Sequence, residues 1–521
     1  MTVPLTPVRF LRRAVSEYPS KVGVVCGEQR FTYAQFGRRC GQLGATLTDL
    51  GVQPGDRVAY LSFNCHRLLE GYYGVLEAGA VLLPLNIRLA PAELSFILND
   101  AEAKVLFYDA EFAPLLNAFR KDLKTVQHFH TLDEYDKMLA EREPRFIDFM
   151  EIDENSGAEL FYTSGTTSSP KGVVLTHRNL HLHALNVIAG LAVGARDTAV
   201  ELHTIPLFHA NGWGRAQSIT LLGGTHVMVR KFDPAAILAL IEKERVQAFS
   251  MVPTMAIALI NSPALGKHDL SSLLYSTIGG AAASPELVER VEKALGCKVY
   301  GGYGLTETSP AMSMAQIKGY MNEPPESRYV RQATGGCALP GTEIRVVDKD
   351  MNDAPCDGVT VGEVITRGDG VMAGYWKQPE ATAEAFRGGW FHTGDLGVMD
   401  RDRYVLIVDR AKEIIISGGE NISSLEVEKA LLAHPAVYEC AVIPVPDDRW
   451  GEVPKALVSV KPGQTLTADE LIEFVKPRLA GFKIPKTVDF VTELPKSGTG
   501  KILKRVLKEK YWEHLTRKVG T

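Results

Sequence analysis

Residues 162–172 form a run of small and hydroxyl-bearing residues that ends in lysine and glycine: Tyr162-Thr163-Ser164-Gly165-Thr166-Thr167-Ser168-Ser169-Pro170-Lys171-Gly172. Main-chain N–H groups and hydroxyls in such a turn can form a nest for an anion, and the small side chains let a polyphosphate approach closely. Lys171 adds a positive charge for the outer phosphates. The spacing is not that of a Walker A loop, because no second glycine stands before the lysine. The run therefore predicts a phosphate-binding loop.

Predicted strands and helices alternate on both sides of this loop. A strand is predicted just before it, at residues 160–162, and a helix after it through Thr176, Asn179 and Leu180. Short β-branched or aromatic runs predict further strands at residues 22–25, 57–61, 105–108, 225–229 and 274–277, and amphipathic segments predict helices at 33–50 and 285–295. Strands separated by helices indicate an α/β fold in which helices cover parallel sheets on both faces.

The character of the sequence changes near Asp409. Between residues 335 and 410 glycines and prolines are dense and the strands short, which predicts a small β-rich subdomain of a large N-terminal domain, residues 1–410. Farther on, strands are predicted at 413–416, 437–443 and 456–460, and helices at 424–434, 468–475 and 502–517. We therefore expect a separate small α+β domain at residues 411–521.

The composition excludes several classes of protein. The chain has 521 residues, of which 45% are apolar and 23% charged, so it is neither disordered nor a collagen-like rod. Its net charge of −5 gives no reason to expect a nucleic-acid partner. The seven cysteines form no CxxC pair, which favours reduced thiols and a cytoplasmic protein. The uncharged window 246–266 carries two prolines, so we expect no transmembrane segment.

A second glycine-rich motif stands at residues 301–308: Gly301-Gly302-Tyr303-Gly304-Leu305-Thr306-Glu307-Thr308. Glycines let the main chain approach a flat base, and Tyr303 offers a ring face on which a base can stack. Glu307 supplies an oxygen suited to Mg²⁺, which binds few protein carboxylates together with substrate phosphates. The alternative interpretation is a tight turn with an exposed acid.

The first run resembles the phosphate loop of the adenylate-forming superfamily, which includes acyl-CoA synthetases, peptide-synthetase adenylation domains and beetle luciferases. The second motif supports the resemblance, and three more matches follow in order. Thr393-Gly394-Asp395 resembles the ribose-binding turn, residues 409–413 resemble the hinge, and residues 495–502 resemble the closing loop. Each match is weak alone, but five in register are specific, and the resemblance covers nearly the whole chain.

The resemblance implies a role for each matched residue. Nucleotide-binding residues would be Thr163, Ser164, Gly165, Thr166, Thr167, Lys171, Gly280, Ala281, Ala282, Gly302, Tyr303, Gly304, Thr306, Asp395, Arg410, Lys412, Gly418 and Gly419. The catalytic residues would be Lys501, Glu307, Thr163 and His209, with Glu307 also the Mg²⁺ ligand. Lys412 would be the pivot of a mobile C-terminal domain. Gly418 and Gly419 would line a thiol tunnel, although a plain turn explains them equally well.

The chemistry of the family explains these residue types. A carboxylate attacks the α-phosphorus of ATP, and the two anions repel each other. A magnesium ion on Glu307 and the ammonium groups of Lys171 and Lys501 would neutralise that charge. Thiol attack on the acyl-adenylate follows and does not need Lys501.

The acid substrate is indicated by two further segments. Residues 206–213 resemble the part of fatty acyl-CoA synthetases in which a tryptophan, here Trp213, gates the acyl channel. His209 would lie near the reacting carboxylate or the thiol exit. The small residues 279–283 leave room for adenine and an apolar tail, so Gly279, Gly280 and Gly301 join His209 and Trp213 as expected substrate contacts. No aspartate stands where an amino-acid substrate would require one.

These observations predict an AMP-forming acyl-CoA synthetase that uses ATP, Mg²⁺ and coenzyme A, with a medium- or long-chain fatty acid as the expected substrate. An aryl or short-chain acid is the runner-up within this class. Three rival classes are a fatty acyl-AMP ligase that serves a carrier protein, a light-emitting oxygenase, and a non-catalytic nucleotide- or lipid-binding protein. The sequence leaves the oligomeric state open, and a homodimer is one of the states that it allows.

Overall fold

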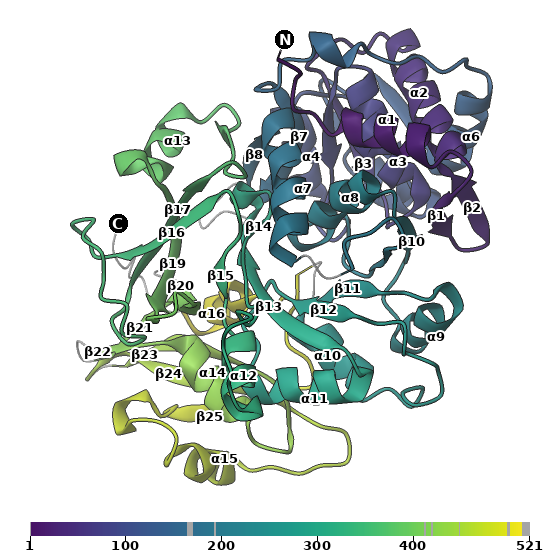
Figure 1. Cartoon of the computed structure of the whole chain (residues 1–521). Coiled ribbons are helices and arrows are strands. Elements are labelled where there is room, and N and C mark those ends of the chain that lie inside the picture. The colour runs from purple at the N-terminus through teal and green to yellow at the C-terminus, as the bar shows by residue number, and fades with distance from the viewer. Residues whose placement is uncertain are drawn as a thin grey trace.

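Four β-sheets organise the molecule in the computed structural model, which describes residues 2–163, 170–191, 194–410, 413–417, 420–447, 449–497 and 501–512 (Figure 1). The side chains of residues 210, 211, 213, 421 and 512 also lie outside this description. Two large sheets and their helices form the N-terminal domain. A four-stranded sheet follows, and the last sheet belongs to the smaller C-terminal domain.

The seven-stranded sheet has the order β18-β8-β7-β4-β3-β5-β6. Its strands are β3 (Arg57–Leu61), β4 (Val81–Pro84), β5 (Ala103–Tyr108), β6 (His128–Thr131), β7 (Gly157–Thr163), β8 (Lys171–Thr176) and β18 (Gly374–Tyr375). Strands β7, β4, β3, β5 and β6 are parallel, whereas β8 and β18 are antiparallel additions at one edge. The phosphate-loop run therefore joins β7 to β8 at the antiparallel edge of this sheet.

The nine-stranded sheet has the order β15-β14-β13-β12-β11-β9-β10-β1-β2. Its strands are β1 (Val22–Cys26), β2 (Gln29–Thr32), β9 (Val200–His203), β10 (Thr225–Met228), β11 (Ala248–Met251), β12 (Tyr275–Ile278), β13 (Lys298–Gly304), β14 (Ala311–Met314) and β15 (Cys337–Ala338). The inner strands are parallel, and β2, β14 and β15 are antiparallel. Both glycine-bearing motifs thus stand where a parallel sheet turns antiparallel.

Helices fill the space between the two large sheets and cover their outer faces. The N-terminal helices are α1 (Val8–Glu17), α2 (Tyr33–Asp49), α3 (His66–Glu77), α4 (Pro91–Asp100), α5 (Ala113–Asn117), α6 (Leu132–Ala140), α7 (His177–Leu191), α8 (Ala210–Leu222), α9 (Pro234–Glu244), α10 (Pro253–Ile260), α11 (Pro285–Leu295), α12 (Pro325–Gln332) and α13 (Pro379–Ala385). The main core packs side chains of α2 and α3, such as Phe36 and Tyr72, between the sheets. Helices α9 to α11 cover the outer face of the nine-stranded sheet and α4 that of the seven-stranded sheet.

Local sequence explains where these helices begin and end. Helix α11 begins at Pro285 after the N-cap Ser284, whose side chain accepts a hydrogen bond from the Leu287 N–H. It ends at Gly296, which has a left-handed φ of 69°. The predicted helix after the phosphate loop is corrected in one respect: residues 171–176 form strand β8, and α7 begins only at His177. The alternating buried side chains Val173 and Leu175 fit a strand that packs one face on the core.

The third sheet is antiparallel throughout and consists of β16 (Thr342–Val347), β17 (Gly362–Gly368), β19 (Phe391–Met399) and β20 (Val405–Arg410). The fourth comprises β21 (Ile415–Ser417), β22 (Glu420–Ile422), β23 (Val437–Asp447), β24 (Gly451–Val460) and β25 (Thr487–Phe490). Helices α14 (Ser424–Leu432), α15 (Ala468–Val475) and α16 (Lys504–Trp512) accompany it. The expected fold class, a large α/β part with a smaller α+β domain after it, is confirmed. No described helix has the length and apolar character that crossing a membrane would require.

Candidate active site

The phosphate-loop run begins and ends on paired strands. Thr163, the last residue of β7, lies opposite Lys171, the first residue of β8. The residues between them that we expect to bind nucleotide, Ser164, Gly165, Thr166 and Thr167, lie outside the described residues. The ammonium group of Lys171 lies 4.9 Å from the centre of the Tyr375 ring. The hairpin therefore holds Lys171 next to a residue more than two hundred positions farther along the chain.

Glu307 is held by the same tyrosine. It lies in a short helical turn after β13, and its Oε1 accepts a hydrogen bond of 3.2 Å from the Tyr375 hydroxyl. Burial raises the pKa of Glu307, although the hydrogen bond from Tyr375 and the charge of Arg410 oppose the shift. Sequence reasoning missed Tyr375, because only the pairing of β18 with β8 brings it to this place.

Asp395 is oriented by one partner on each carboxylate oxygen. The Tyr303 hydroxyl donates to Oδ2 at 2.7 Å, and Nε of Arg410 lies 3.3 Å from Oδ1. Asp395 and Arg410 face each other across the β19–β20 pair. Burial raises the pKa of Asp395, and the nearby Arg410 charge opposes that shift. The Tyr303 hydroxyl thus positions a carboxylate, whereas the stacking of a base on its ring stays a prediction.

Lys501 comes from the small domain and lies in a loop that contacts the large one. Its loop is closed by hydrogen bonds from the Ser497 N–H to the Lys501 carbonyl (2.7 Å) and from the Lys501 N–H to the Ser497 hydroxyl (3.2 Å). Nη1 of Arg88, in the large domain, donates to the Ser497 carbonyl at 3.1 Å. The residue is exposed at the surface, yet desolvation by the protein around it, followed by the charge of Arg410, lowers the pKa of Lys501, while Glu413 and Asp395 raise it. The lysine therefore lies within electrostatic range of the expected ribose-binding pair.

His209 is uncharged at neutral pH. Burial, with a further contribution from the Lys501 charge, lowers its pKa to about 4. The residue lies in the turn before α8, where its N–H donates to the Pro206 carbonyl. A neutral imidazole cannot neutralise an anion by its charge, but one of its ring nitrogens can accept a hydrogen bond or a proton. The side chain of Trp213 lies outside the description.

The glycines of the second motif differ in how much space the structure leaves for a side chain. A Cβ on Gly301 would lie 2.3 Å from the Thr334 carbonyl oxygen, and one on Gly304 would overlap the Pro310 carbonyl. Close packing within the protein therefore explains both glycines, and Gly301 is buried rather than open to a substrate. Gly302 differs, because a Cβ there would meet Met314 and the Ser313 carbonyl oxygen at ordinary contact distances. Gly302 is thus the motif glycine whose identity the interior does not explain.

The remaining predicted residues differ in exposure, and three of them lie outside the described residues. Gly280, Ala281 and Ala282 are exposed after β12, whereas Gly279 is buried and Thr306 half-buried. Lys412, Gly418 and Gly419 lie outside the described residues. In the part of the chain that the structure describes, no group of three or more His, Cys, Asp or Glu side chains could hold a metal. A single carboxylate such as Glu307 nevertheless fits Mg²⁺ that is bound mainly by phosphates.

The hinge segment contains a carboxylate that sequence reasoning passed over. Asp409 is fully buried, and its Oδ2 accepts hydrogen bonds from the Ser424 N–H (2.6 Å) and hydroxyl (2.8 Å) at the start of α14. Its other oxygen accepts from the Arg410 N–H at 2.7 Å. Asp409 therefore ties the end of β20 to the first helix of the small domain.

Comparison with known proteins places the chain in a family. The family model described as AMP-binding enzyme matches residues 11–376, and its C-terminal domain matches residues 426–501. A long-chain-fatty-acid–CoA ligase of Thermus thermophilus is 40% identical, with 96% of this chain and 95% of that protein covered. A peroxisomal butyrate–CoA ligase of Arabidopsis thaliana is 37% identical (97% and 93% covered), and a feruloyl-CoA synthase of Amycolatopsis is 39% identical (97% and 98% covered).

Solved structures show the same similarity. The anthranilate CoA ligase AuaEII in complex with anthranoyl-AMP has a TM-score of 0.90 at 27% identity, with 98% of each chain covered. ATP-bound MatB from Rhodopseudomonas palustris has a TM-score of 0.86, whereas apo MatB has 0.75, each at 30% identity and with 98% of this chain and 100% of MatB covered. Over the whole chain, the present structure is thus more similar to ATP-bound MatB than to apo MatB.

The fold, the order of the motifs and these matches define an adenylate-forming enzyme. The chain belongs to the AMP-binding enzyme family and is an acid–thiol ligase of the AMP-forming type.

Proposed function

We propose that the protein is an ATP- and Mg²⁺-dependent acyl-CoA synthetase. The single observation that carries the proposal is the position of Lys501. A lysine from the small domain lies within electrostatic range of Asp395, Arg410 and His209, which come from three other segments. The greater overall similarity to ATP-bound than to apo MatB supports the same interpretation.

In the first step the acid carboxylate would attack the α-phosphorus of ATP and release pyrophosphate. Asp395 would accept hydrogen bonds from the ribose hydroxyls, and Lys171 with the phosphate loop would hold the outer phosphates. Glu307 would hold Mg²⁺, which supplies positive charge to the phosphates when bound. Lys501 would neutralise the charge that develops between the carboxylate and the α-phosphate, and preorganised charge of this kind is usually the largest catalytic contribution.

In the second step CoA would attack the acyl-adenylate and release AMP. We propose that the small domain, residues 411–521, rotates about Lys412 between the steps and removes Lys501 from the site. Gly418 and Gly419 would then line the path of the thiol. Contacts such as that of Arg88 with Ser497 belong to the first arrangement and would break on rotation.

For the acid we propose a medium- or long-chain fatty acid, supported by the exposed small residues 280–282 and by the Thermus relative. A specific observation favours a second candidate, a short or aryl acid. A buried ion pair of 2.8 Å joins Arg215 and Glu201, and Arg215 also donates to the Tyr275 hydroxyl. Tyr275 begins β12, so an acyl chain running along that strand from Gly280 would meet this polar cluster after about 17 Å.

A panel of acids distinguishes these candidates. With ATP, CoA and saturated acids of increasing length, we expect AMP release with kcat/KM rising about fourfold per added CH₂ until the pocket is full. A maximum at butyrate or at a cinnamate would replace the fatty acid by the second candidate. Adding free CoA tests the carrier-protein alternative, because CoA should raise AMP release by an acyl-CoA synthetase and not by a ligase that needs a carrier protein. No AMP with any acid would refute the proposed function altogether.

Adenylation should fall on both sides of neutral pH. Glu307 and Asp395 act as carboxylates, and burial raises the pKa of both, so the acid limb should lie above that of an exposed carboxyl group. Lys501 acts as an ammonium group, and desolvation lowers its pKa from 10.5. As the pH rises, the lysine should therefore lose its proton, and the rate should fall, at a pH lower than 10.5. In Lys501→Arg any remaining rate should lack the alkaline limb, because guanidinium keeps its proton. Pyrophosphate exchange against pH measures both limbs, and an alkaline limb that persists in Lys501→Arg would contradict this role.

We also propose that the protein is located in the cytoplasm. The cysteine pattern favours the cytoplasm, and the described cysteines are all free. Several relatives are named as peroxisomal, so the compartment needs a direct localisation experiment.

A further inference from the structure

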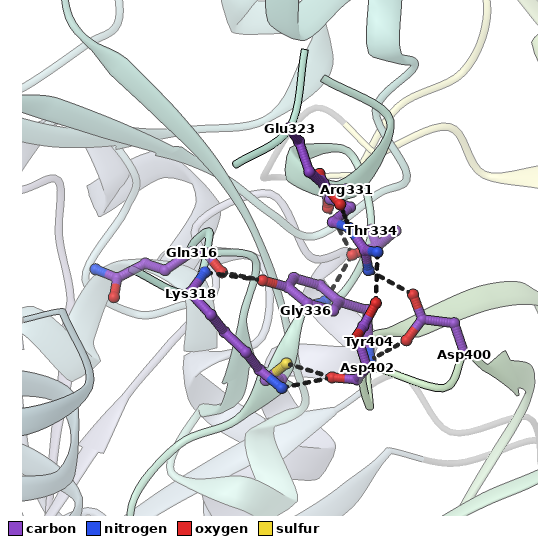
Figure 2. Close-up of polar contacts among 10 residues, drawn as sticks. Gln316, Lys318, Glu323, Arg331, Thr334, Gly336, Asp400, Asp402 and Tyr404 are labelled. Atoms are coloured by element: carbon purple, nitrogen blue, oxygen red, sulfur yellow. Dashed lines mark hydrogen bonds and ion pairs between the residues drawn. The ribbon is translucent and has the colours of Figure 1, made fainter. Parts of the chain in front are cut away.

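Arg331, in α12, is the centre of a polar cluster that joins two parts of the large domain (Figure 2). Its guanidinium makes three ion pairs: Nε with Glu323 (2.5 Å), Nη1 with Asp400 (2.7 Å) and Nη2 with Asp402 (2.6 Å). The face of the same group lies 4.8 Å from the centre of the Tyr404 ring. Asp400, Asp402 and Tyr404 belong to the turn between β19 and β20, so one side chain holds that turn at several points.

The same turn is also bound by the segment that follows β14. The Tyr404 hydroxyl donates to the Gln316 carbonyl at 2.6 Å and accepts from the Lys318 N–H at 3.3 Å. The Lys318 ammonium group donates to the Asp402 carbonyl at 2.7 Å. Within the turn, Asp400 accepts a hydrogen bond from the Tyr404 N–H, which fixes its shape. The β19–β20 turn is therefore attached to the nine-stranded sheet and not merely in contact with it.

The main chain after Arg331 connects this cluster to the glycine-rich motif. The Thr334 hydroxyl donates to the Arg331 carbonyl and accepts from the Gly336 N–H. Gly336 forms a β-bridge with Val405, the first residue of β20. Gly301 packs so closely on the Thr334 carbonyl that it has no room for a side chain. Movement of the turn relative to α12 would therefore be transmitted to both sides of the candidate nucleotide site.

The other end of the β19–β20 hairpin carries Asp395 and Arg410, roughly 20 Å along β20 from the turn. We propose that Arg331 is a positioning residue for the nucleotide: it fixes the hairpin so that Asp395 meets the ribose hydroxyls. This inference rests on the proposed function. Arg331 touches neither nucleotide nor acid and acts only through the hairpin.

Arginine suits this role better than lysine. Its planar guanidinium group can pair with three carboxylates at fixed angles while its face stacks on an aromatic ring. A lysine ammonium group would keep the charge but not this geometry. The Arg331→Lys variant should therefore fold, but it should restore little of the positioning that the arginine provides.

The test is the ability to distinguish ATP from 2′-deoxy-ATP, measured as binding by calorimetry without acid or CoA. The wild-type chain should bind ATP more tightly than 2′-deoxy-ATP, because Asp395 accepts hydrogen bonds from the ribose hydroxyls. The Asp395→Asn variant should lose most of that preference. In Arg331→Met we expect ATP affinity to fall about tenfold, while 2′-deoxy-ATP affinity falls much less, so the preference shrinks. In turnover, KM for ATP should rise and KM for the acid should stay unchanged.

The matched control is Arg345→Met. Arg345, in β16 of the same sheet, pairs with Asp353 at 2.6 Å and lies 5.1 Å from the centre of the Trp390 ring, but it makes no contact with the β19–β20 turn in the part of the chain described. It should lower stability without changing the preference between the two nucleotides.

A second, milder variant tests the same inference in case Arg331→Met does not fold. Asp402→Asn removes one of the three carboxylates, leaves the main-chain bond to Lys318, and should shift the preference in the same direction by a smaller factor. A folded Arg331→Met or Asp402→Asn protein with the wild-type preference would overturn the inference. A wild-type protein that binds neither nucleotide would instead refute the proposed function, and the two failures are therefore distinguishable.

Discussion

Replacing Lys501 by alanine should slow adenylate formation by about 10²–10³-fold and spare thioester formation. The ammonium group is the positive charge that the small domain adds beside Asp395 and Arg410, where the carboxylate and the α-phosphate would meet. Loss of one preorganised group of this kind costs about 10²–10³ in rate. The second half-reaction takes place after Lys501 has left the site, so acyl-CoA formation from supplied acyl-adenylate should stay close to the wild-type rate.

The control for this variant is Lys496→Ala. Lys496 begins the same loop and lies opposite Ile502, but its ammonium group pairs with Glu439 inside the small domain at 2.7 Å. It should lower stability somewhat and leave the ratio of the two half-reactions unchanged. If a folded Lys501→Ala protein loses both half-reactions equally, the assignment of Lys501 to the first step is wrong.

Replacing Glu307 by glutamine should lower the adenylation rate by about 10²-fold. The amide keeps the shape of the side chain and can still accept a hydrogen bond from Tyr375, so only the charge for Mg²⁺ is lost. The apparent KM for Mg²⁺ should rise at the same time. Pyrophosphate exchange at several magnesium concentrations measures both effects.

Two further variants show whether the charge or the orientation of Glu307 matters. Tyr375→Phe removes the hydroxyl that donates to Glu307 and should cost about tenfold, as expected for one hydrogen bond to a charged group. Glu286→Gln changes an exposed glutamate in the first turn of α11 and should have no effect. Adenylation that is as fast in Glu307→Gln as in the wild-type chain would exclude Glu307 as the metal ligand.

The sequence predicted secondary structure well where the signal is local. Residues 57–61, 285–295 and 468–475 form a strand and two helices with the predicted bounds. The run after the phosphate loop is less clear, because Thr176 and Asn179, whose polar side chains can cap a helix, indicate a helix start. That start is real, and the two residues exchange capping hydrogen bonds, but β8 precedes it. A short strand that gains its hydrogen bonds from distant partners leaves little local signal.

The candidate site shows the same division. Glu307, Asp395, Arg410 and Lys501 could be proposed from their motifs, because each motif is a short stretch of fixed residue types. Tyr375, Arg88 and Arg331 could not, because none of them stands in such a motif. The Tyr375–Glu307 contact spans 68 residues and the Arg88–Ser497 contact spans 409. These three residues matter only through where the sheets and domains place them.

The sequence by itself determined the chemical groups of this protein, their order along the chain, and an α/β fold, because residue type and hydrophobic period are local properties. Tertiary structure alone decided which groups meet: Tyr303 with Asp395, Tyr375 with Glu307, and Lys501 with the large domain. Such contacts depend on strand register and on the placement of one domain against another. A hydrogen bond tolerates only a few tenths of an ångström, and no local pattern fixes distances so closely between residues that far apart.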